Sequence, residues 1–116
     1  MTEYLPNYLH TFRKRSAYSQ AELAFLLGEQ TAKATSHYER AVREPDLRTV
    51  IAFEVVFDEL AAKLFAGIYE EVELTVILQA RTLCERIEVQ DHSAFADQKL
   101  SALRRIMSRG KSARAK

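Results

Sequence analysis

The sequence is poor in residues that interrupt helices and in the residue that forms cross-links. Its 116 residues include three glycines, two prolines and one cysteine. Few helix breakers, together with apolar residues at 3.6-residue spacing, predict an all-α fold. The single Cys84 excludes an internal disulfide, and one cysteine with three scattered histidines is too few for a zinc site. We therefore expect no metal and no cofactor, and we interpret Cys84 as a small core residue.

Long apolar runs are also missing. No uninterrupted stretch approaches the roughly 20 residues that a membrane-spanning helix requires. The N-terminal residues lack the apolar run of a secretion signal. We therefore expect a cytoplasmic protein without a membrane partner.

Charge of one sign is scarce in the chain as a whole, since 17 Lys and Arg residues stand against 16 Asp and Glu residues. The net charge of +1 gives no global electrostatic argument for nucleic-acid binding. The distribution is uneven, because residues 99–116 include seven Lys or Arg residues and no acid. We expect residues 109–116 to form a disordered basic tail, as charged chain ends usually do.

A pair of short helices joined by a tight turn is the clearest feature of the sequence. Ser19 and Glu22 form a capping box that predicts a helix start. An apolar stripe follows, and Gly28 supplies the left-handed residue that ends this helix. Thr31 can cap a second helix, which would turn Thr35 and Tyr38 inward. Its outward positions are polar: Lys33, Ser36, His37 and Arg40.

The spacing S-Q-x-E-L-A-x-x-L-G, followed by S-H-Y-E-R at 36–40, resembles the helix-turn-helix of phage Cro and repressor proteins, the Xre family. The resemblance covers roughly residues 5–65. It implies a five-helix head whose third helix enters the DNA major groove. It also implies a partly buried ion pair between Arg13 and Glu39, which would tie the first helix to the end of the third.

The resemblance assigns DNA contacts to a set of residues around the second helix of the motif. Those expected to face bases are Ala32, Lys33, Ser36 and His37, and those expected to hold phosphates are Gln20, Arg40 and Arg43, with Thr31 at the helix start completing the set. Ala32 departs from the family, because a methyl group can contact only a thymine methyl. The turn is also one residue longer, with Glu29 and Gln30, and Thr35 replaces a buried aliphatic residue.

Three further helices complete the predicted head, which we assign to residues 1–66. The first covers about 7–16. Ala17 follows it where the resembling family usually has glycine, so the loop is either mildly strained by a left-handed alanine or differently shaped. Asp46 caps a helix over 47–57 whose expected core stripe is Leu47, Val50, Phe53 and Phe57. Asp58 ends that helix in the left-handed region, a short helix covers 61–65, and Gly67 is the expected stop.

The amphipathic pattern of residues 67–108 predicts a helical extension. A helix over about 68–89 has an apolar stripe too wide for a free-standing arm. A turn at 90–93, with Ser93 or Asp91 as the cap, leads to a last amphipathic helix that ends near Ser108. Two such helices form an antiparallel hairpin. We expect this hairpin to form a homodimer, with residues 68–107 also available to a protein partner.

These observations favour a sequence-specific DNA-binding regulator that acts as a homodimer on double-stranded DNA. We do not expect an enzyme, because the chain has no Gly-rich phosphate loop and no recognisable Ser/His/Asp arrangement. The alternative is a protein-interaction module, such as an antitoxin or accessory factor, whose head has weak or lost DNA affinity. The near-neutral charge, Thr35 and the longer turn favour this alternative.

Overall fold

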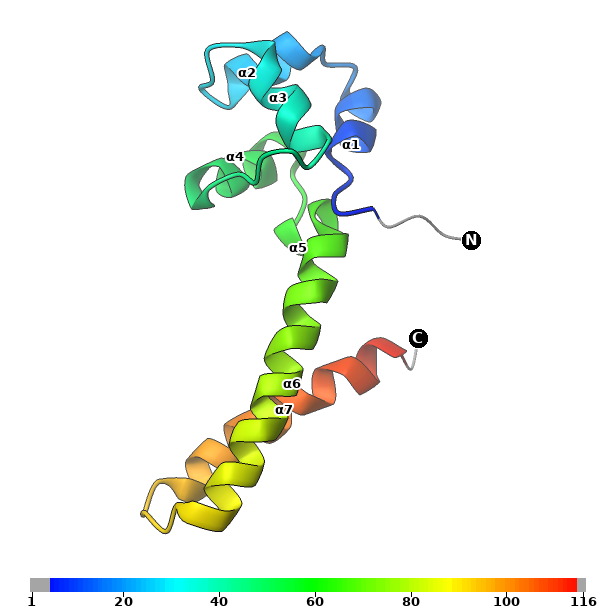
Figure 1. Cartoon of the computed structure of the whole chain (residues 1–116). Coiled ribbons are helices and arrows are strands. Elements are labelled where there is room, and N and C mark those ends of the chain that lie inside the picture. Colours follow the sequence, from blue (N-terminus) through cyan, green and yellow to red (C-terminus); the bar gives the residue numbers. More distant parts are fainter. Residues whose placement is uncertain (1–4, 115–116) are drawn as a thin grey trace. The chain divides into compact units, whose positions relative to one another are not determined.

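The computed structural model describes the backbone of residues 5–114 and the side chains of residues 5–109. Over this range the chain forms seven helices and no strand, which confirms the all-α prediction (Figure 1). They are α1 (Leu9–Ser16), α2 (Gln20–Leu26), α3 (Ala32–Glu39), α4 (Leu47–Phe57), α5 (Ala61–Leu64), α6 (Ala66–Gln90) and α7 (Ala96–Arg114). The chain divides into two compact units between Tyr69 and Glu70, inside α6.

The helix ends of the first unit follow local sequence signals. The Ser19 hydroxyl accepts the Glu22 N–H (3.0 Å) and the Glu22 carboxylate accepts the Ser19 N–H (2.8 Å), so the capping box is present. The Asp46 carboxylate accepts the Thr49 N–H in the same way (2.9 Å). Left-handed residues follow three helical segments, as predicted for Gly28 (φ 79°) and Asp58 (φ 49°). Ala17 (φ 64°), whose conformation the sequence left open, is the third.

Aromatic packing around Phe53 holds the first unit together. Phe53 is fully buried, and its ring centroid lies 5.8 Å from those of both Tyr38 and Phe65, each in an edge-on arrangement. Leu9, Leu23 and Leu64 complete the fully buried apolar set, so that α1 to α5 all contribute to one core. Edge-on aromatic pairs add stability beyond their buried area.

The prediction that Leu47 belongs to this core is wrong. Leu47 is 74% exposed, whereas Phe53 is buried and Val50 and Phe57 are partly buried against the core. The reason is the helical period, because Leu47 shares its face with Ile51 and Val55 at intervals of four residues. The stripe Leu47, Ile51 and Val55, which we call the α4 stripe, is exposed along its whole length.

Gly67 does not stop a helix but lies inside α6, which begins at Ala66. A Cβ atom at Gly67 would stand 2.2 Å from the Leu5 carbonyl oxygen and 2.7 Å from Cα of Pro6. The Ile68 N–H donates to the Pro6 carbonyl at 3.2 Å. Gly67 is therefore a point of close backbone approach, where the N-terminal segment crosses the first turn of α6.

The second unit is a helical hairpin of α6 and α7, as predicted. Its small core consists of Ala80, Cys84, Ile87 and Leu103. The Cys84 thiol donates to Glu88 Oε1 (3.4 Å), and burial raises the pKa of this thiol.

The turn between the two hairpin helices uses both proposed caps. The Asp91 carboxylate accepts the Ser93 N–H (2.8 Å) and the Ser93 hydroxyl accepts the Phe95 N–H (3.3 Å). Two ion pairs join α7 to earlier residues. Lys99 pairs with Asp91 of the turn (2.9 Å), and Arg109 pairs with Glu73 of α6 (2.9 Å).

The last helix does not end near Ser108. α7 continues to Arg114, so residues 109–114 of the predicted disordered tail are helical, while residues 115–116 lie outside the described range. Three apolar residues of α6, Val72, Val76 and Leu83, remain 42–56% exposed. Within residues 5–114, no helix is long and apolar enough to cross a membrane.

Candidate nucleic-acid interface

Helices α2 and α3 pack closely and leave one side of α3 accessible. Ala34, Thr35 and Tyr38 form the buried side of α3. The side opposite carries the residues that the sequence assigns to DNA. Lys33 and Arg40 are exposed, while Ser36 and His37 are partly exposed beside them. This face is polar and rich in hydrogen-bond donors.

Thr31 and Ala32 begin this face. Thr31 occupies the N-cap position of α3, but its side chain makes no capping hydrogen bond. Its hydroxyl is exposed, and the Ala32 methyl group is partly exposed next to it. Six of the eight residues predicted to bind DNA therefore lie on α3 or directly at its two ends, from Thr31 to Arg40.

The longer turn between α2 and α3 is anchored at Glu29. The Glu29 N–H donates to the Ala24 carbonyl (2.9 Å), which closes the end of α2. The Tyr38 hydroxyl donates to Glu29 Oε1 (2.9 Å). Burial and this hydrogen bond raise the pKa of Tyr38. The extra residue is thus held against α3.

The loop after α3 is held against the same tyrosine. Ala41 adopts a left-handed conformation (φ 58°), and the Val42 N–H returns to the His37 carbonyl (2.9 Å). The chain then places the Arg43 guanidinium over the Tyr38 ring, 5.2 Å from its centroid. Tyr38 therefore joins the turn before α3 to the loop behind it. Sequence reasoning missed both contacts of Tyr38, because they depend on how the two loops fold back.

Two of the predicted phosphate ligands are partly engaged within the protein. Arg40 Nε donates to the Ser36 hydroxyl (3.1 Å), which lays the arginine along the α3 face and leaves its terminal nitrogens available. Gln20 Nε2 donates to Glu39 Oε1 (3.2 Å). Only the second hydrogen of that amide group remains for a phosphate, since the amide oxygen is an acceptor.

The ion pair expected between Arg13 and Glu39 is present and is buried within the head. Arg13 Nε and Glu39 Oε2 are 2.5 Å apart, and the two side chains are only 7% and 5% exposed. Arg13 also donates to Glu39 Oε1 (3.2 Å) and to the Tyr18 carbonyl (3.0 Å). Burial acts to raise the pKa of Glu39, but the hydrogen bonds from Arg13 and Gln20 outweigh it and leave that pKa lowered.

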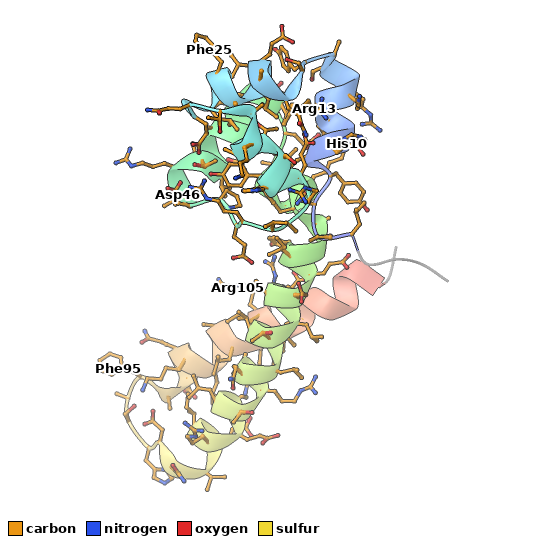
Figure 2. The ribbon with its side chains drawn as sticks, turned by 45° about the horizontal axis from the view of Figure 1, so that its top comes forward. His10, Arg13, Phe25, Asp46, Phe95 and Arg105 are labelled. Atoms are coloured by element: carbon orange, nitrogen blue, oxygen red, sulfur yellow. The ribbon has the colours of Figure 1, made fainter. Side chains whose placement is uncertain are left out.

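A histidine without a predicted functional role lies at the edge of this ion pair. His10 Nδ1 is 3.4 Å from Glu39 Oε1 and 3.3 Å from Arg13 Nη2 (Figure 2). The His10 side chain is 60% exposed. The buried ion pair therefore has an exposed imidazole in contact with both of its members.

Exposed apolar side chains lie outside the α3 face. Phe25 on α2 is 81% exposed and points away from the head in Figure 2. It lines a shallow depression together with Tyr18, Ala21, Glu22 and Leu26. The α4 stripe is a second apolar surface. Neither surface offers the donors that a nucleic acid requires.

Comparisons with known protein families, curated proteins and solved structures found no significant match to this chain. Among the residues that the structure describes, no group of three His, Cys, Asp or Glu side chains is arranged to hold a metal ion.

Proposed function

We propose that this chain is a cytoplasmic transcription regulator of the Xre type that binds double-stranded DNA as a homodimer and places α3 in the major groove. The observation that carries the proposal is the division of α3 into two sides. Ala34, Thr35 and Tyr38 fix one side in the head, and the other presents Lys33 and His37 one turn apart. An α-helix of this kind fits the major groove, where base edges form a readable pattern.

The residues on and around α3 then have distinct roles. Lys33, near the N-terminal end, donates to guanine O6 and N7, and a good base contact is worth about 1–3 kcal/mol of discrimination. Arg40 and Arg43 hold phosphates, which position the helix without reading sequence. The contact between Arg43 and the Tyr38 ring supports this role, because it holds the guanidinium beside the end of α3.

The homodimer forms through α6. Val72, Val76 and Leu83 lie on one side of this helix and remain about half exposed in the single chain. Apolar rows of this kind normally mark an interaction surface. Two-fold pairing predicts two DNA half-sites about one helical turn, ~34 Å, apart.

Selection from a random duplex library tests the proposal directly. The parent protein should enrich a two-fold symmetric sequence. Lys33→Ala should flatten base preference at one or two positions of each half-site, whereas Arg40→Ala should weaken all sequences alike and lower the salt slope by about one unit. Lys14→Ala, which removes an exposed lysine from α1, is the matched control and should leave the selected sequence unchanged. No enrichment, combined with no retention of bulk DNA at low salt, would reject the proposal.

The second candidate function is a protein-interaction module. The α4 stripe and Phe25 favour it, because the head exposes more apolar surface than a DNA-binding role needs. A chain that binds no duplex at low salt, but whose association with a partner is lost in Ile51→Asp, supports this candidate over the regulator.

A further inference from the structure

Helix α7 has an outer face that carries unpaired positive charge. Lys99 is bonded to Asp91 and Arg109 to Glu73, so these two cations are neutralised at opposite ends of the helix. Arg104 and Arg105 between them are exposed and form no ion pair with any residue in the range 5–109. Lys111 and Arg114 add two positive charges to the sequence of the same helix, which has one acid, Asp97.

The order of residues in α7 places the two arginines and the apolar side chains on different sides of the helix. Leu103 is buried against α6, and Leu100, Ile106 and Met107 pack against the same cluster. The exposed residues Ser101 and Ser108 lie between Arg104 and Arg105 on the helical wheel. Between Arg104 and Arg105 the outer face thus has short hydroxyl side chains, and the exposed carboxylate of Asp97 lies on the same face one turn before Ser101. A polyanion backbone could approach this face closely over the turns from Ser101 to Ser108, C-terminal to Asp97.

We propose that this outer face of α7 is a second, sequence-independent binding site for the phosphate backbone of duplex DNA. The inference rests on the proposed function in one respect, since the reading helix α3 is the reason to choose duplex DNA as the polyanion. An anionic membrane is the less suitable partner, because a basic amphipathic helix binds membranes through its apolar side. In α7 that side is already occupied by α6.

Salt dependence of binding to a mixed-sequence duplex tests the inference. Each phosphate neutralised contributes a slope of about 0.9 in log K against log salt. Arg104→Gln/Arg105→Gln should therefore reduce the slope by about 1.8. Between 50 and 200 mM salt, the parent should lose about tenfold more affinity than this variant. Both positions are exposed, so the variant should keep the helical circular dichroism of the parent.

Arg81→Gln/Arg86→Gln is the matched control, because it removes the same charge from exposed positions of α6 in the same unit. The slope should change by less than half as much in this control. Equal changes in both variants would mean that only net charge matters and would overturn the inference. An unchanged slope in Arg104→Gln/Arg105→Gln would also overturn it.

The library selection separates this inference from the proposed function. Enrichment that depends on Lys33, with a salt slope that does not depend on Arg104 and Arg105, leaves the regulator in place and rejects the α7 site. A slope that depends on the two arginines without any enriched sequence supports the α7 site alone. Binding of phosphatidylserine vesicles that requires the two arginines, without duplex binding, would reject the α7 site as a DNA contact.

Discussion

Loss of Glu39 should lower the free energy of unfolding by about 3 kcal/mol, the usual cost of removing one half of a buried ion pair. The structure supports this size because the Arg13 and Glu39 side chains are almost fully enclosed. In Glu39→Ala the guanidinium keeps its bond to the Tyr18 carbonyl but loses both carboxylate oxygens. A domain of ordinary stability, roughly 5–15 kcal/mol, stays folded after such a loss, so the change can be measured.

Urea unfolding followed by helical circular dichroism measures this change. Arg13→Met/Glu39→Leu should recover most of the loss, since it removes both charges and fills the space with apolar groups. Glu44→Ala, at an exposed loop position, is the control and should lie within about 0.5 kcal/mol of the parent. Single variants at Arg13 and Glu39 that also lie within that range would refute the reasoning, because they would show an ion pair without energetic weight.

The same ion pair predicts a pH dependence. The pKa of Glu39 is lowered in the folded chain, whereas in the unfolded chain it is about 4.3. The stabilisation is therefore complete above the unfolded value and is lost as pH falls through the folded value. The stability difference between the parent and Glu39→Gln should be constant from pH 7 to about 5 and shrink below about 4. A difference that stays constant to pH 3 would contradict the lowered pKa.

Three further predictions concern other positions. Thr35→Val should raise the free energy of unfolding by about 1 kcal/mol, because the Thr35 hydroxyl is fully buried and has no hydrogen-bond partner among the residues that the structure describes; a thermal melt showing a loss would contradict this. Gly67→Ala should destabilise the chain by about 1–3 kcal/mol, since its Cβ would overlap the Leu5 carbonyl. Gly28→Ala is the comparison: the space around it is open, so its loss of stability should come from backbone strain alone. Val76→Asp should convert a dimer to a monomer in light scattering, and a parent that is already monomeric at tens of micromolar (roughly) would reject the α6 interface.

Local signals made much of the head predictable from sequence. Capping pairs such as Ser19 with Glu22, and left-handed ends such as Gly28 and Asp58, involve residues only a few positions apart, so their physics is visible in the chain itself. The ion pair between Arg13 and Glu39 joins residues 26 positions apart. No local signal predicts such a contact, and only the family resemblance led to it.

The errors occurred where several local patterns were compatible with the same residues. Helix α4 is apolar on two sides, and its period alone did not show which side faces the core, so Leu47 was misplaced. Gly67 could equally end a helix or permit close packing, and only the position of Leu5 decides between them. Of the α3 site, the outward face was predictable from helical spacing. The contacts of Tyr38 with Glu29 and Arg43 were not, because they depend on how two loops fold back.

The position of Tyr38 between those two loops also bears on the entropy of binding. In the free chain the Arg43 guanidinium already rests on the Tyr38 ring, and the Tyr38 hydroxyl is fixed by Glu29. Ordering a long side chain at an interface costs about 0.5–1.5 kcal/mol. If Arg43 binds an anion, part of the entropy cost of ordering its side chain has therefore already been incurred during folding. In the proposed DNA complex, the affinity of the α3 surface would thus be set partly by a tyrosine whose buried side chain need not touch the DNA.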